Sequence, residues 1–107
     1  MHVMVCGLGA VGARVARYLI SSDDVGNLLV TDTDRKRRAA VAGSLGARAR
    51  AVDSFDDAID QRVDVVVLAT PAARQVALAS AAMAAGRHVV ATADSLSAVR
   101  SLLDLDP

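Results

Sequence analysis

Three glycines near the start of the chain have the spacing of a phosphate-binding loop, G-x-G-x-x-G. In such loops the first glycine, here Gly7, allows a tight turn out of a strand. The second, Gly9, lets the backbone approach a pyrophosphate, and the third, Gly12, lets the following helix pack closely on the sheet. The anion then binds free N–H groups at the positive end of that helix. The predicted contacts are Gly7, Leu8, Gly9, Ala10, Val11 and Gly12.

An acidic residue follows at the distance that this loop requires. Asp32 lies twenty positions after Gly12 and directly after a second apolar run. A carboxylate at that point can accept hydrogen bonds from the ribose hydroxyls of adenosine, and it would repel a 2′-phosphate. Asp32 therefore favours NAD as the cofactor, and its neighbour Thr33 is a further candidate contact. The same glycines would also suit a tight turn without a ligand, but a strand, a helix and an acid in this order favour binding.

A basic run, Arg35-Lys36-Arg37-Arg38, follows the acid at once. Such runs are usually solvated helix faces, but a nearby arginine can hold a 2′-phosphate. NADP is therefore the alternative cofactor, with Arg35 as its candidate ligand. Asp34 is predicted to cap the helix that begins here. Ser54, with Asp57 three positions later, has the spacing of a capping box before another, short helix.

Two further turns carry polar residues where later strands are expected to end. Ala69, Thr70 and Pro71 follow the fourth apolar run, and Thr92 follows the fifth. Because ligands of open parallel sheets lie at the carboxyl ends of the strands, we expect these residues to face the nicotinamide side of a dinucleotide. Thr70 and Pro71 can equally begin a helix, as its N-cap and first-turn proline. Asp94 could meet the nicotinamide or cap a last helix.

No set of residues suited to proton transfer is evident, so the catalytic residues are left unassigned. Cys6 precedes the glycines within a strand and is predicted to be a small buried side chain. His2 and His88 begin strands and have no acid or nucleophile beside them in the sequence. A bound dinucleotide would supply the hydride, while the protein positions it. No metal-ligating pattern occurs, and we expect no metal site.

Short strands that alternate with helices must position these residues. Apolar runs predict strands at residues 2–6, 28–31, 48–52, 63–69 and 88–91, and helices at 10–20, 35–45, around 58–59, 72–85 and 95–103. In the first helix, Val11, Val15 and Tyr18 or Leu19 recur at helical spacing and are expected to face the core. The alternation predicts an α/β fold of the doubly wound, Rossmann type. It has a parallel sheet of about five strands in three layers, α/β/α.

The composition excludes several other classes of protein. The 107 residues fit one domain, and 12 basic residues balance 12 acidic ones, unlike the basic surface of a nucleic-acid binder. One cysteine excludes an internal disulfide framework. The sequence begins directly with an apolar strand, and no apolar run is long enough for a membrane helix, so we expect a cytoplasmic protein.

The whole chain resembles the N-terminal NAD(P)-binding domain of the saccharopine dehydrogenase family. The similar segments are VMVCGLGAVGARVARYL, VDVVVLATPAARQVALASAAMAAGRHVVATAD and DSLSAVRSLLDLD. Their shared pattern is a Thr-Pro turn, an alanine-rich helix ending in Gly-Arg-His, a strand and a Thr-x-Asp turn. In looser form this pattern is similar to homoserine dehydrogenase-like and Gfo/Idh/MocA-like oxidoreductases.

The resemblance implies an NAD(P)-dependent oxidoreductase that acts on an amino-acid-like or related small substrate. In such families a second α/β domain binds the substrate and completes the active site. We therefore expect residues 1–107 to be the cofactor domain of a longer oxidoreductase, with the missing substrate domain as its partner.

Two other functions share parts of the pattern. A nucleotide-sensing regulatory domain, similar to those of potassium transport systems, also has the glycine loop and the acid, and usually forms homodimers. An S-adenosylmethionine-dependent methyltransferase shares the fold and the acid, but it has no need of Gly12.

Overall fold

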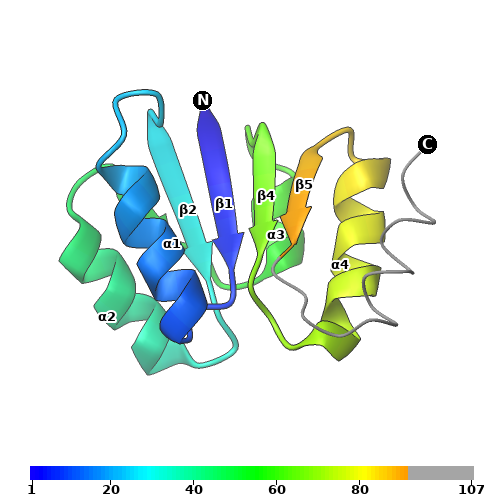
Figure 1. The fold of residues 1–107 in the computed structure, drawn as a ribbon, viewed down its shortest axis with the longest axis horizontal. Helices are drawn as coiled ribbons and strands as arrows, with labels where there is room; N and C mark the ends of the chain where they lie inside the picture. The colour runs from blue at the N-terminus through cyan, green and yellow to red at the C-terminus, as the bar shows by residue number, and fades with distance from the viewer. Residues whose placement is uncertain (92–107) are drawn as a thin grey trace.

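The computed structural model describes residues 1–91 (Figure 1). The helix expected at residues 95–103, and with it Thr92 and Asp94, lies outside the described residues. Helices and strands alternate from the first residue to the last described one. The strands are β1 (His2–Cys6), β2 (Asn27–Thr31), β3 (Ala49–Ala51), β4 (Val65–Leu68) and β5 (His88–Ala91). The helices are α1 (Ala10–Ile20), α2 (Arg35–Leu45), α3 (Phe55–Ile59) and α4 (Ala72–Ala84).

The five strands of residues 1–91 pair in the order β3-β2-β1-β4-β5, and every pair is parallel. From β1 the chain passes through α1 to β2 and through α2 to β3, moving toward one edge of the sheet. It then crosses back so that β4 lies on the other side of β1. The strand order therefore reverses between β1 and β4, which confirms the predicted doubly wound fold. At such a reversal the loops leaving the two strands separate and open a crevice at their carboxyl ends.

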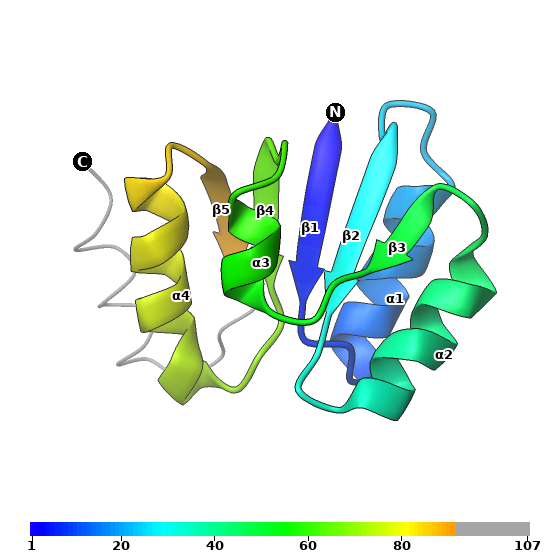
Figure 2. The same cartoon turned by 180° about the vertical axis from the view of Figure 1, so that it is seen from behind.

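The helices cover both faces of the sheet. Helices α1 and α2 pack on one face, in front of β2 in Figure 1, and α3 and α4 pack on the other (Figure 2). Within β1, Met4 and Cys6 point toward α3 and α4, whereas Val3 and Val5 point toward α1 and α2. These side chains are at most 2% exposed, as expected of a central parallel strand buried on both faces. The three predicted layers are confirmed.

The predicted buried face of the first helix is partly wrong. Val11 is 53% exposed and Tyr18 is 76% exposed, while the buried residues of α1 are Gly12 and Ala16. Val15 and Leu19, the alternative to Tyr18, pack against the core as expected. Small residues face the sheet because α1 approaches the backbone of the β1–α1 loop too closely for large ones. Apolar periodicity alone does not include this close approach, since glycine carries no apolar side chain.

The ends of several elements differ slightly from the prediction. β3 spans Ala49–Ala51 instead of residues 48–52, and β4 spans Val65–Leu68 instead of 63–69. Differences of one or two residues at element ends are expected of any assignment. Among the described helices, none has both the length and the apolar character needed to cross a membrane.

Candidate functional site

A cleft of about 520 Å³ opens at the carboxyl ends of β1 to β4. It contains seven of the residues that the sequence predicts for the site, namely Gly7, Gly9, Asp32, Thr33, Ala69, Thr70 and Pro71. Asp53 and Ser54 of the loop after β3, with Phe55 at the start of α3, also line the cleft, and this loop was not among the predicted ones. The remaining lining residues are Cys6, Thr31, Arg37, Arg74 and Leu78. The predicted residues from three separate loops thus share one site.

The structure explains the presence of glycine differently at the three positions of the loop. Gly7 has φ +91°, and a Cβ there would lie 2.7 Å from the carbonyl group of Ala69. A Cβ on Gly12 would lie 1.7 Å from the carbonyl oxygen of Gly7. Both glycines are therefore required by the fold itself. A Cβ on Gly9 would meet nothing within 4 Å, so the fold leaves open the space above this residue.

The first turn of α1 adjoins this open space. Gly9 is the N-cap, and no side chain caps the helix. In contrast, the Asp34 carboxylate caps α2 and the Ser54 hydroxyl caps α3, which confirms both predicted caps. The first N–H groups of a helix have no intrahelical partners. The uncapped start of α1 therefore offers backbone donors and a positive helix end to an anion.

Not all six predicted loop residues face the cleft. Leu8 is only 2% exposed, and its side chain packs in the core beneath α1 and α2. Ala10 and Val11 are exposed on α1, and Gly12 is buried beneath the loop. Of the loop, Gly7 and Gly9 line the cleft.

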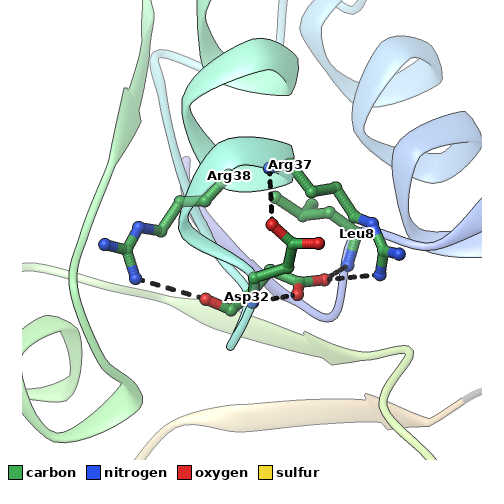
Figure 3. Close-up of polar contacts among 5 residues, drawn as sticks. Leu8, Asp32, Arg37 and Arg38 are labelled. Carbon is green, nitrogen blue, oxygen red and sulfur yellow. Dashed lines mark hydrogen bonds and ion pairs between the residues drawn. The ribbon is translucent and has the colours of Figure 1, made fainter.

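Asp32 lies at the centre of the polar contacts in the cleft (Figure 3). Its Oδ2 accepts a hydrogen bond from the Leu8 N–H at 2.6 Å, and its Oδ1 accepts one from the Asp34 N–H at 2.8 Å. The Arg37 guanidinium lies 3.6 Å from Oδ2. Burial disfavours ionisation of the carboxyl, but the two N–H groups and Arg37 together outweigh it, so the pKa of Asp32 is lowered. The carboxylate stays charged at neutral pH.

The arginines of the basic run have three different positions. Arg35 is exposed and is not among the residues that line the cleft, whereas Arg37 lines it. Arg38 is nearly buried and joins two loops. Its Nη1 donates to the carbonyl of Asp32 at 3.2 Å (Figure 3) and to the carbonyl of Asp53 at 3.0 Å. Its Nη2 also donates to the Asp53 carboxylate at 3.1 Å. The sequence did not distinguish these roles, because they depend on the direction of each side chain around the helix.

The loop after β4 forms the opposite wall of the cleft. Pro71, not Thr70, is the N-cap of α4, and the Thr70 hydroxyl is buried without a hydrogen-bond partner. The alternative in which Thr70 caps this helix is therefore wrong. Gln75, 1% exposed, donates from Nε2 to the Thr70 carbonyl at 2.8 Å and holds the loop in place. Arg74 lies in the first turn of α4 and lines the cleft; nothing in the sequence singled it out.

The remaining candidates have no evident catalytic geometry. Cys6 lies at the floor of the cleft, and burial raises the pKa of its thiol to about 12 although Arg74 opposes the shift. His2 lies at the opposite end of the sheet, where its ring contacts the Asn27 side chain, and His88 is exposed at the start of β5. Within residues 1–91, no three His, Cys, Asp or Glu side chains gather closely enough to hold a metal ion.

Comparisons with known proteins agree with this geometry. Residues 1–92 match the model of the Gfo/Idh/MocA family, described as an oxidoreductase family with an NAD-binding Rossmann fold. None of the curated protein sequences matches the chain in a direct comparison. The matching family is the looser of the resemblances seen in the sequence. Saccharopine dehydrogenase, the nearer resemblance, is not supported by the similar structures.

Three solved structures illustrate the similarity. GenD2 from gentamicin A biosynthesis, in complex with NAD, has a TM-score of 0.84 at 31% identity, over 98% of this chain and 31% of its own. UDP-N-acetylglucosamine 3-dehydrogenase GnnA from Acidithiobacillus ferrooxidans has a TM-score of 0.76 at 30% identity, over 98% and 34%. Biliverdin reductase from Synechocystis sp. PCC 6803, in complex with biliverdin and NADP+, has a TM-score of 0.80 at 27% identity, over 97% and 34%. The chain thus spans about a third of the length of the solved structures it matches.

Proposed function

Because the chain belongs to the Gfo/Idh/MocA oxidoreductase family with its NAD-binding Rossmann fold, we propose that the cleft described above binds NAD for hydride transfer. One observation carries the proposal: the space above Gly9 is open, adjoins an uncapped helix start, and shares the cleft with the Asp32 carboxylate. A fold that only needed a tight turn would require glycine at positions 7 and 12 but not at 9.

Each part of the dinucleotide has a matching wall of the cleft. The pyrophosphate binds at the start of α1 above Gly9, where backbone N–H groups are available. The ribose hydroxyls of adenosine donate to Asp32, and the adenine extends toward residues 53–55. The nicotinamide half extends toward Thr70 and Pro71. Bound NAD supplies the hydride acceptor, and the chain itself orients it.

The charges around Asp32 favour NAD over NADP. A 2′-phosphate would meet a carboxylate that is held ionised by its two N–H donors. If NADP were bound instead, Arg37 would be the arginine that contacts the 2′-phosphate, since it lines the cleft and Arg35 does not.

We expect Asp32→Ala to weaken NAD binding more than NADP binding, because only NAD offers a 2′-hydroxyl to the carboxylate. Equal losses of affinity for NAD and NADP in calorimetric titrations would mean that the ribose contacts another residue.

We further propose that the chain is the cofactor domain of a longer oxidoreductase, as the matched structures are about three times as long. A second domain would then supply the substrate site and the proton-transfer group, neither of which is evident in residues 1–91. The finer assignment, a saccharopine dehydrogenase-like enzyme with an amino-acid-like substrate, has only the sequence resemblance in its support. The cytoplasmic location stays a prediction.

The experiment that tests the proposal is calorimetric titration of the purified chain with NAD, NADH, NADP and NADPH, with S-adenosylmethionine as the control. We expect binding of NAD or NADH with a stoichiometry of one, and none of S-adenosylmethionine. Binding of S-adenosylmethionine alone, or of none of these ligands, would contradict the proposal.

The alternative regulatory function is distinguished by the oligomeric state. Val11 and Tyr18 are exposed on α1, and exposed apolar side chains of this kind can form a dimer contact. Light scattering with and without NAD measures this directly. Nucleotide-linked dimerisation would favour the regulatory domain, whereas a state that does not change with NAD favours the cofactor domain.

A further inference from the structure

We propose that Asp32 is also a positioning residue: its carboxylate holds the glycine loop in the shape that receives the pyrophosphate, independently of any ribose contact. The inference rests on the proposed function and deepens it. The observation behind it is the hydrogen bond of 2.6 Å from the Leu8 N–H to Asp32 Oδ2. Leu8 lies in the middle of the glycine loop, so this bond joins the loop directly to the end of β2.

The backbone of the loop around Leu8 has few other hydrogen bonds to neighbouring strands. Before Leu8, the Gly7 N–H donates to the Thr31 carbonyl at 2.9 Å. After it, Gly9 is the uncapped start of α1. The Leu8 side chain is buried, while its N–H points toward Asp32, whose side chain is only 7% exposed. A partly buried N–H with a charged acceptor is a strong, directional contact, and without the acceptor the N–H would have to find another partner.

The carboxylate has enough acceptor sites for both roles. An ionised carboxylate offers about four lone-pair sites. In this structure Oδ1 accepts from the Asp34 N–H, and Oδ2 accepts from the Leu8 N–H and faces Arg37. A site on the carboxylate therefore remains for a ribose hydroxyl while the bond to Leu8 is kept. A ligand without ribose hydroxyls would still bind to a loop that Asp32 holds.

Loss of the carboxylate then has an effect beyond the ribose. When the loop is free to leave its receiving shape, the affinity for any phosphate ligand falls in proportion to the fraction of molecules that keep the shape. A role limited to the ribose would affect only ligands that carry the hydroxyls. These two expectations separate when the hydroxyls are removed from the ligand.

The test compares ADP with 2′,3′-dideoxy-ADP, each titrated into the wild-type chain and into Asp32→Ala and Asp32→Asn. We expect Asp32→Ala to lower the affinity for dideoxy-ADP by about tenfold, as it would if the loop kept its shape in about one molecule in ten. Asp32→Asn should recover part of this loss, because its amide oxygen can still accept from the Leu8 N–H. The matched control is Asp34→Asn, which removes a neighbouring charge but keeps a good helix cap. Equal dideoxy-ADP affinity in the wild type and Asp32→Ala would overturn the positioning role.

A second measurement needs no ligand. Amide hydrogen exchange by NMR should show the Leu8 N–H protected in the wild type and at least about tenfold faster in Asp32→Ala, with the Gly7 N–H as the internal reference. Unchanged Leu8 exchange would overturn the inference. If neither ADP nor NAD binds the wild type but Leu8 exchange depends on Asp32, the proposed function fails, and only the structural link between Asp32 and the loop stands. If ADP and NAD both bind but the affinity for dideoxy-ADP does not depend on Asp32, the proposed function stands and the positioning role fails.

Discussion

Gly9 is a glycine that the fold does not require but a bound nucleotide would. Its backbone has φ −65° and ψ −165°, which other residues adopt as readily, and an added Cβ would meet no atom within 4 Å. Neither strain nor packing explains a glycine there. A ligand that occupies the open space does explain the glycine. The adjoining helix start would bind its phosphates, and the Asp32 carboxylate would bind its ribose hydroxyls.

This gives a direct prediction for Gly9→Val. We expect nucleotide affinity to fall by at least about a hundredfold, because the two methyl groups occupy the place of the pyrophosphate. The free energy of unfolding should change by less than about 1 kcal/mol, the ordinary range for an unburied substitution. Calorimetry and urea unfolding measure the two quantities, with Gly43→Ala on the exposed part of α2 as the control. Undiminished affinity would mean that the loop is not the binding site.

Asp32 gives a prediction for the pH dependence of stability. Its pKa in the folded chain is lowered, so the folded state favours the ionised carboxylate. The stabilisation is therefore fully present above the unfolded pKa of about 4 and is lost as the pH falls through the lower folded value. We expect the stability difference between the wild type and Asp32→Asn to shrink as the pH falls from 5 toward 2, roughly the window below the unfolded pKa. Urea unfolding at several pH values checks this, and a constant difference would contradict it.

At the scale of elements, the packing of α1 against the loop that precedes it determines where the site lies. The closest contact is at Gly12, where a Cβ would lie 1.7 Å from the Gly7 carbonyl oxygen. This contact is between backbone atoms, which cannot turn away as a flexible side chain could. The start of α1 therefore stays beside the ends of β1 and β4, with Ala69 packed against the same glycines.

We accordingly expect Gly12→Ala to destabilise the fold by about 2–4 kcal/mol, since overpacking against backbone forces α1 outward. Gly43→Ala in α2 should instead stabilise it by up to about 1 kcal/mol, because alanine is the better helix former. Chemical unfolding of both variants checks the contrast. If Gly12→Ala were as stable as the wild type, the close approach of α1 would not be rigid.

At the scale of the whole molecule, the cleft exists because loops from four strands meet at one edge of the sheet. Arg38 donates hydrogen bonds to carbonyl groups of two of these loops, and Gln75 donates one to a carbonyl group of a third. A ligand that spans the cleft contacts loops from both sides of the strand reversal, so it binds the folded chain only. NAD at a hundred times its dissociation constant should therefore raise the free energy of unfolding by about 2.7 kcal/mol. Thermal unfolding with and without NAD measures the rise, and Gly9→Val should abolish it.

Much of this molecule could be predicted from its sequence. The alternation of apolar runs and helices, the glycine spacing and the acid after the second run determined the fold class and the cofactor loop. The caps Asp34 and Ser54 were predicted as well. These features are local, because strand burial, turn conformation and helix capping each depend on residues within a few positions of one another.

Only the tertiary structure decided which side chains share the cleft and what each of them contacts. Arg37 lines the cleft while Arg35 does not, and Phe55 and Arg74 join it from the first turns of α3 and α4. The bond from Leu8 to Asp32 likewise joins residues 24 positions apart. Such contacts follow from the order β3-β2-β1-β4-β5, which brings the ends of distant strands together. The sequence determined the pieces of the site, and the crossing of the chain between β3 and β4 decided how they meet.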